Sequence, residues 1–317
     1  MRGSCLVAAL IVGFAAPAVA GPLEDGLTAY GEGDYATALE HWRPLAEQGL
    51  ADAQSSLGLM YAKGEGVPRD DAEAVKWYQR AAGQGHAEAQ YNLGSMYDDG
   101  VGVSRNRSDA ARWYRKAAEQ GLARAQYNLG AMFTTGVGVP RDDAEAVKWF
   151  RMAAEQGYAP AQSDLGSMYG TGAGVPRNDA EAVEWHRRAA DQGYAESVKW
   201  FREAARRGDA VAQHNLGVMY AEGKGLARSH AAAVRWYREA AQQGHAGAQT
   251  ELGMMYAKGE GVLQSWVQAY AWLDVAAANG MRDAARMRNL AIDELTKEKR
   301  VEAAELAREY FEKYRAK

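Results

Sequence analysis

The stretch AQSSLGLMYAKGEGVPRDDAEAVKWYQRAAGQG, residues 53–85, decides the fold of this chain. A glycine loop, Gly-Glu-Gly-Val at residues 64–67, separates its two halves. In each half, apolar and small residues recur at i, i+3, i+4 and i+7, which is the spacing of an amphipathic helix. The stretch therefore predicts two antiparallel helices joined by a short turn.

The same stretch recurs along the chain with a period of 36 residues. A glycine series keeps this period at Gly58, Gly94, Gly130 and Gly166, and again at Gly217 and Gly253. A tryptophan series keeps it at Trp77, Trp113, Trp149 and Trp185, and again at Trp200, Trp236 and Trp272. A period of this length is typical of arrays in which each unit buries its apolar face against the next.

The helix ends of each unit have recognisable signals. Seven residues before a tryptophan stands a good N-cap residue, whose side-chain oxygen can accept a hydrogen bond from the first helical turn; these residues are Asp70, Asn106, Asp142, Asn178, Ser229 and Ser265. A glycine suited to a left-handed C′ position closes each second helix; these glycines are Gly85, Gly121, Gly157, Gly193, Gly208 and Gly244. The signals predict sharply bounded helices.

Composition narrows the class of protein. The 317 residues include 37 Lys and Arg against 41 Asp and Glu, which gives a net charge of −4. This balance lacks the basic surface that nucleic-acid binding needs, so we expect no nucleic-acid partner. Apolar residues make up 47% of the chain, which is enough to bury a core and excludes a disordered protein.

Residues 1–20 have the pattern of a signal peptide. Arg2 supplies the positive charge, residues 6–16 form a short apolar run, and Ala18-Val19-Ala20 is a small-residue cleavage site. We predict cleavage after Ala20, a periplasmic location with secretion as the alternative, and no membrane span after cleavage. Because Cys5 lies in this segment, the mature chain would have no cysteine and no disulfide.

The repeats give a predicted organisation with one irregularity. We divide the chain into a signal peptide (1–20), an N-terminal capping helix pair (21–50), four repeats (51–193), an irregular single helix (194–208), two repeats (209–281) and C-terminal capping helices (282–317). In the irregular segment, a first-helix beginning at Tyr194 runs directly into a second-helix ending at Ala205, without a glycine loop. Such a segment is either a hinge between two arrays or a recombination scar absorbed by local packing.

The repeated motifs resemble the Sel-1-like repeat family, a relative of the tetratricopeptide repeats. The matching parts are the Ala-Gln-x-x-Leu-Gly-x-Met-Tyr half, the Gly-x-Gly-Val-x-x-Asp/Asn loop and the Trp-Tyr/Phe-x-x-Ala-Ala-x-x-Gly half. The resemblance implies an all-α fold, a right-handed α-solenoid of stacked antiparallel helix pairs. It also implies protein–protein binding, because periplasmic members act as adaptors in envelope assembly, signalling or secretion, and one subclass restrains a sensor kinase.

Patterns typical of catalysis are scarce. No two histidines have the i, i+4 spacing of a helical zinc site, and His86 and His245 occupy the same unit position, which indicates a structural turn residue. No Ser-x-x-Lys motif is present, and Ser197 comes closest with Lys199 two positions on. The Gly-x-Gly-Val loops lack the Lys-Ser/Thr ending of a phosphate-binding loop. We therefore expect no catalytic residues, metal or cofactor.

The first helices supply the candidate binding site. One unit position repeats Tyr-Asn or a related pair, and its members are Tyr91, Asn92, Tyr127, Asn128, Asp164, His214, Asn215 and Glu251. A ladder of side-chain amides in a concave groove could hold the backbone of an extended peptide. The alternative is that these are consensus residues that hydrogen-bond neighbouring turns.

The second helices carry a basic ridge, which we interpret as a solvated face balanced by nearby glutamates, with an acidic protein or a glycan as alternative partners. Its members are Lys76, Arg112, Lys116, Lys148, Arg151, Arg187, Arg188, Arg202, Arg235 and Arg238. The sequence thus predicts a non-catalytic adaptor of the bacterial cell envelope that binds a protein or peptide in its concave groove. Alternatives are a cell-wall peptide or β-lactam hydrolase and a peptidoglycan- or polysaccharide-binding module.

Overall fold

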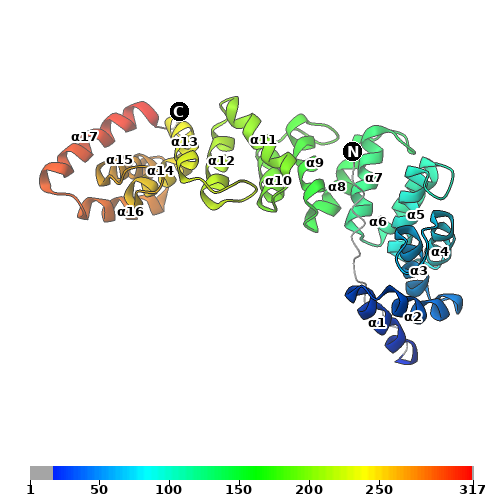
Figure 1. The fold of residues 1–317 in the computed structure, drawn as a ribbon. Coiled ribbons are helices and arrows are strands. Elements are labelled where there is room, and N and C mark those ends of the chain that lie inside the picture. The colour runs from blue at the N-terminus through cyan, green and yellow to red at the C-terminus, as the bar shows by residue number, and fades with distance from the viewer. Residues whose placement is uncertain (1–16, 316–317) are drawn as a thin grey trace. The chain divides into compact units, whose positions relative to one another are not determined.

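The computed structural model describes residues 17–315, and side chains from residue 21 to 315, so most of the predicted signal peptide, 1–16, lies outside the described residues. The described chain consists of α-helices joined by turns, and no β-strand occurs in it. Consecutive helices pack as antiparallel pairs (Figure 1). The fold is therefore an all-α solenoid, which confirms the fold class predicted from the repeats.

Most helices have the same length, 13 residues, because the same caps bound each of them. In chain order they are α1 (Pro17–Glu32), α2 (Tyr35–Glu47), α3 (Ala51–Lys63), α4 (Asp71–Gly83), α5 (Ala87–Asp99), α6 (Arg107–Glu119), α7 (Ala123–Thr135), α8 (Asp143–Glu155), α9 (Ala159–Thr171), α10 (Asp179–Asp191), α11 (Ala195–Arg206), α12 (Ala210–Glu222), α13 (His230–Gln242), α14 (Ala246–Lys258), α15 (Trp266–Ala278), α16 (Arg282–Asp293) and α17 (Lys297–Tyr314). We call α3, α5, α7, α9, α12 and α14 first helices, and α4, α6, α8, α10, α13 and α15 second helices.

The predicted caps are present. Asp70 accepts a hydrogen bond from the Glu73 amide at 2.9 Å, and the other five predicted N-cap residues make the corresponding contact. The glycines after the second helices have positive φ, between 79° at Gly193 and 94° at Gly85. His86 and His245 are also caps, because their Nδ1 atoms accept hydrogen bonds from Ala89 and Ala248. The structural role predicted for both histidines is confirmed.

A glycine in each first helix lets the two helices of a repeat approach closely. A Cβ atom at Gly58 would lie 2.7 Å from the ring of Tyr78, and one at Gly130 would lie 2.8 Å from the ring of Phe150. The tryptophan that immediately precedes this aromatic residue in the sequence packs onto the preceding repeat instead. Trp113, for example, lies against the cluster that contains Tyr78. Aromatic residues therefore fill both the interior of each repeat and the seam between repeats.

Contacts between helices divide the chain into two units. The first unit ends at Ala153 and the second begins at Ala154. In the first unit, two core clusters follow one another, one around Trp42 and Leu57 and the next around Tyr78 and Leu93. The second unit has three such clusters, centred on the helices around α11, α13 and α15.

The irregular segment forms one helix, α11, in the second unit. Its Trp200 and Phe201 occupy the places that Trp77 and Tyr78 hold in a complete repeat, and Phe201 is fully buried. The loop after α12 packs across it: a Cβ atom at Gly225 would lie 2.8 Å from Val198 and 3.1 Å from the Ala190 carbonyl of α10. The single helix is thus absorbed into a continuous core cluster, and the hinge stays a prediction.

Helices α1 and α2 lie at one end of the described chain and α16 and α17 at the other, and their capping role stays a prediction. At the N-terminal end, α1 and α2 meet at a turn where Gly33 has a φ of 84°, and Trp42 lies buried between them with its Nε1 donating to the Leu23 carbonyl. At the C-terminal end, α16 packs on α15, and α17 runs beside α15 as well (Figure 1). Tyr310 and Tyr314 of α17 lie against Trp272, which is 3% exposed.

Candidate functional site

The predicted binding residues lie on first helices of both units. Tyr91, Asn92, Tyr127 and Asn128 belong to α5 and α7 of the first unit, and all four are half-buried. In the second unit, Asp164, His214 and Asn215 are half-buried and Glu251 is exposed. Within each unit these side chains occupy one register on the first helices of the repeats.

The aromatic members of this set pack inside their own repeats. The Tyr91 ring lies 5.6 Å from that of Tyr114, and the Tyr127 ring lies 5.6 Å from that of Phe150. His214 repeats the arrangement with Tyr237, at 5.8 Å. Their half-buried rings are therefore held in place by the second helix. This packing gives weight to the alternative that these are consensus residues, and their role in binding stays a prediction.

The asparagines face tyrosine hydroxyls of the preceding repeat. Burial raises the pKa of Tyr78, and the nearby Arg124 guanidinium and Asn92 side chain oppose this rise. Burial likewise raises the pKa of Tyr114, and the Asn128 side chain opposes it in the same way. A primary amide has two donor hydrogens and an acceptor oxygen. The tyrosine hydroxyl could engage only one of these groups on each asparagine.

An ion pair beside Tyr91 was missed from the sequence. The guanidinium of Arg124 in α7 is paired with the carboxylate of Glu88 in α5, and it lies 4.5 Å from the centre of the Tyr91 ring. Glu88 is only 8% exposed. The available signal was the opposite charge of two residues at the same repeat position. One repeat earlier, Asp52 occupies the position of Glu88. Its carboxylate accepts a hydrogen bond from Nε2 of His86 at 3.1 Å.

In the second unit the equivalent face contains two stacked imidazoles. The rings of His214 and His245 lie 4.6 Å apart. Burial lowers the pKa of His214 to about 4, and the adjacent His245 adds to this effect. Burial also lowers the pKa of His245. Both rings are therefore neutral at neutral pH, and this part of the face offers hydrogen-bonding imidazoles rather than positive charge.

A buried serine–histidine contact lies at the irregular segment. His186 Nδ1 is 3.2 Å from Ser197 Oγ, and the His186 ring stacks on Trp200 at 4.3 Å. Such a pair superficially matches a nucleophile and its base. However, Ser197 is 0% and His186 is 1% exposed, so the hydroxyl is closed to solvent. Burial also lowers the pKa of His186 to about 4, which leaves a neutral ring in a packing role.

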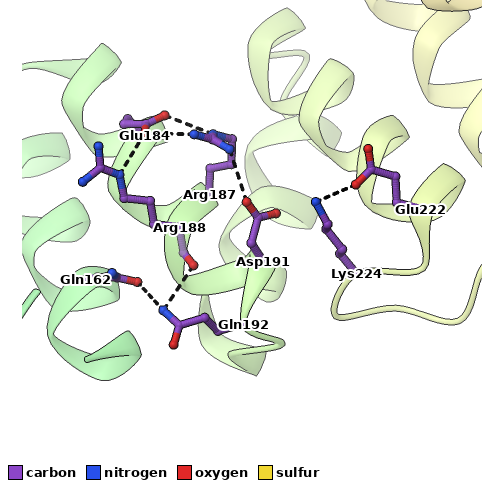
Figure 2. Close-up of polar contacts among 8 residues, drawn as sticks. All are labelled: Gln162, Glu184, Arg187, Arg188, Asp191, Gln192, Glu222 and Lys224. Atoms are coloured by element: carbon purple, nitrogen blue, oxygen red, sulfur yellow. Dashed lines mark hydrogen bonds and ion pairs between the residues drawn. The ribbon is translucent and has the colours of Figure 1, made fainter. Parts of the chain in front are cut away.

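A ladder of buried side-chain amides connects successive repeats. The glutamine of the Ala-Gln-x-x-Leu-Gly-x-Met-Tyr motif supplies these amides, but the sequence alone did not predict this function. Gln90 Nε2 donates to the Ala82 carbonyl at 3.1 Å, and Gln90 Oε1 accepts from Gln120 Nε2 at 2.8 Å. Figure 2 shows one such step in the second unit, where Gln192 donates to Gln162 at 2.9 Å. The buried members are Gln54, Gln90, Gln126, Gln162, Gln213 and Gln249. Each ties the end of the preceding helix to the repeat that follows it.

At least five of the ten residues of the basic ridge form ion pairs with neighbouring carboxylates; they include Lys76, Arg112, Lys148, Arg187 and Arg188. In Figure 2, Arg187 and Arg188 of α10 both pair with Glu184 at 2.9 Å, and Arg187 also reaches Asp191 at 3.2 Å. In the first unit Lys76 pairs with Glu73 in the same way, at 2.8 Å. Because each of these basic side chains lies beside a carboxylate and is exposed, the pairs agree with the interpretation of a solvated face of balanced charge. Surface ion pairs of this kind contribute little to the free energy of unfolding.

Within residues 17–315, no helix is both long and apolar enough to cross a membrane. In the same range, no cluster of three or more His, Cys, Asp or Glu side chains is arranged to hold a metal ion.

The comparison with protein families gives one match, to the family described as "Sel1 repeat". The matched residues are 21–50, 51–86, 87–122, 123–158, 159–194, 194–209, 210–245 and 246–281. The chain belongs to the Sel1 repeat family. The sixth Sel1 match spans only 194–209 and coincides with the shortened segment around α11.

Solved structures of Sel1 repeat proteins resemble this chain. A Sel1 repeat protein from Oxalobacter formigenes is 33% identical, with a TM-score of 0.50, over 80% of this chain and 96% of that one. A protective antigen present in uropathogenic Escherichia coli strains, which displays an SLR fold, is 31% identical, with a TM-score of 0.49, over 93% of this chain and 84% of that one. No curated protein sequence matches the chain.

Sel1 repeat proteins are generally scaffolds for protein–protein interaction, and the fold is typically non-catalytic. This family role agrees with the predicted class of function.

Proposed function

We propose that this protein is a non-catalytic scaffold of the bacterial cell envelope that binds a protein partner as an extended peptide along its first helices. The observation that carries the proposal is the recurrence of half-buried amides at one register, Asn92 in α5 and Asn128 in α7. Each amide can both donate and accept hydrogen bonds, as the backbone of an extended peptide requires. A repeating array offers such contacts at regular intervals.

The surroundings of these amides support a preformed surface. The Tyr91 ring is held by Tyr114 on one side and by Arg124 on another, and Glu88 fixes Arg124 in turn. Side chains that are already ordered lose less conformational entropy when a ligand binds. A peptide that met this face would therefore find fixed rather than mobile partners.

The non-catalytic part of the proposal is supported by the burial of the Ser197–His186 contact. A nucleophilic hydroxyl must reach its substrate, and Ser197 has no exposed surface.

The envelope location rests on the leader alone. A processed protein would begin at Gly21, because the small-residue site ends at Ala20. Fractionation of cells followed by N-terminal sequencing tests this directly. We expect the periplasmic fraction to contain a chain that starts at Gly21. A chain that keeps residues 1–20 and stays in the cytoplasmic fraction would contradict the location.

The binding proposal is tested by affinity capture from envelope extracts with the full mature chain as bait. The test variant is Asn92→Ala/Asn128→Ala, which removes the amides from two consecutive first helices. The control variant is Lys76→Ala/Lys148→Ala, which removes two exposed side chains from second helices at one register. Far-UV circular dichroism checks that both variants keep wild-type helix content.

We expect one or more envelope proteins to be captured by the wild type and the control, and to be lost with the asparagine variant. Equal capture by all three baits would show that the first-helix amides are not the binding site.

A further inference from the structure

The last repeat departs from three earlier repeats where its second helix begins. In three earlier repeats, an arginine before the N-cap forms an ion pair with the aspartate after it, at 3.0, 2.8 and 2.9 Å; these pairs are Arg69–Asp71, Arg141–Asp143 and Arg177–Asp179. At the start of α15 the equivalent residues are Gln264 and Trp266. The proline that precedes these arginines is replaced by Leu263, which is 91% exposed. At this position the chain carries an apolar surface where those three repeats carry a charged one.

One of the exchanged residues, Trp266, lines a cavity of about 460 Å³ in the second unit. On one side, Trp266 and Val267 of the first turn of α15 form its wall. On the other side, Leu295 precedes α17 and Leu306 belongs to it. All four side chains are half-buried, so the cavity is reached from solvent. Its size and apolar walls suit a single large apolar side chain.

The cavity continues a seam that aromatic side chains already fill. One turn further along α15, Tyr310 and Tyr314 of α17 lie 4.5 and 5.5 Å from Trp272. The Tyr310 hydroxyl donates to Gln268 Oε1 at 3.0 Å, and Gln268 also lines the cavity. Tyr310 and Tyr314 thus fill the part of the seam between α15 and α17 that adjoins the cavity.

The rim of the cavity carries no net charge. Lys299 and Glu302, both in α17, form an ion pair of 2.5 Å with each other. The arginine–aspartate pairs of earlier repeats are absent here, as described above. An uncharged rim favours an uncharged occupant, because a charged one would lose hydration without a partner.

We propose that this cavity binds an aromatic side chain, of tyrosine or phenylalanine, which a partner polypeptide presents to the C-terminal end of the array. The occupant would extend the row formed by Tyr310 and Tyr314 by one more ring, and Leu263 would add apolar contact outside the cavity. Aromatic side chains bury a large area with few rotatable bonds and commonly anchor protein interfaces. The site is separate from the first-helix amides, so it does not depend on the proposed peptide groove.

Saturation-transfer NMR on the full mature chain tests the proposal, with N-acetyl-L-tyrosinamide as the probe and N-acetyl-L-leucinamide and N-acetyl-L-lysinamide as comparisons. The test variant is Leu263→Pro/Gln264→Arg/Trp266→Asp, which restores residues that earlier repeats carry and therefore is expected to fold. Trp266→Asp alone serves as a second, milder variant. The control is Leu290→Gln, which removes an apolar side chain that is 64% exposed on α16 and does not line the cavity.

We expect saturable transfer to the tyrosine probe with the wild type and the control, and binding weaker by at least about tenfold with both cavity variants. The lysine probe should give no transfer. Equal signals from the triple variant and the wild type, no signal from the wild type, or loss of signal in Leu290→Gln would each overturn the site. Equal binding of the leucine and tyrosine probes would overturn its aromatic preference.

Discussion

Replacing Gln90 with alanine tests whether the buried amide ladder holds successive repeats together. Gln90 is 4% exposed, and its side chain makes two hydrogen bonds, to the Ala82 carbonyl of the preceding second helix and from Gln120 of the following one. A side-chain hydrogen bond contributes about 1 kcal/mol net, and the small cavity left by truncation adds to the loss. We therefore expect Gln90→Ala to lower the free energy of unfolding by about 2–3 kcal/mol.

Urea unfolding followed by far-UV circular dichroism measures this loss. The matched control is Gln79→Ala, because Gln79 is exposed in α4 and its contact with Tyr97 is long, at 3.4 Å. An exposed substitution of this kind changes the free energy of unfolding by less than about 0.5 kcal/mol. If Gln90→Ala were as stable as Gln79→Ala, the ladder would not connect the repeats energetically, and the reasoning would be wrong.

Three further predictions concern stability and activity. His186 is buried and neutral with a pKa of about 4, against 6.5 when unfolded, so the stability that its neutral ring provides is present above pH 6.5 and is lost as the pH falls toward 4. His186→Phe, which places there the residue found at Phe150, should flatten this part of the pH profile of the unfolding midpoint; an unchanged profile would contradict the burial of the ring. Gly130→Ala should lower the free energy of unfolding by about 1–3 kcal/mol, because its Cβ would lie 2.8 Å from the Phe150 ring. Gly83→Ala, which has open space around it, should leave the free energy of unfolding unchanged or raise it by up to about 1 kcal/mol. Equal urea midpoints for the two variants would count against close helix packing. The purified protein should not hydrolyse nitrocefin above background, and turnover that depends on the protein would refute the non-catalytic function.

The local features of the fold could be predicted from the sequence because they depend on residues close together in the chain. The N-cap at Asp70 and the positive φ of Gly85 follow from rules that involve only a few neighbours. The close packing at Gly58 follows from the repeat, because every copy places a small residue there. A period repeated many times makes each of these predictions more secure.

Other features depend on contacts that a local pattern does not contain. The role of Gln90 needs Ala82 in α4 and Gln120 at the C-cap of α6, on either side of its own helix. The pairing of Glu88 with Arg124 needs the stacking of two repeats. Both became visible only when the helices were placed in space.

The candidate site shows the same division between local and distant contacts. The sequence located Tyr91 and Asn92 on a first helix, and the structure places them there. Their packing against Tyr114 and their approach to Tyr78 lie outside what their own helix could reveal. Residues that serve both packing and recognition have the same pattern as residues that serve packing alone, so their part in binding stays a prediction.

Site-specific photo-crosslinking in living cells tests the central claim most directly. A crosslinking amino acid is placed at Asn92 or Asn128 on the first helices, and at Lys76 or Lys148 on the second helices. The proposed scaffold predicts that the first-helix positions capture a common envelope protein and that the second-helix positions do not. Capture from the second-helix positions alone would contradict the claim that partners are bound along the first helices.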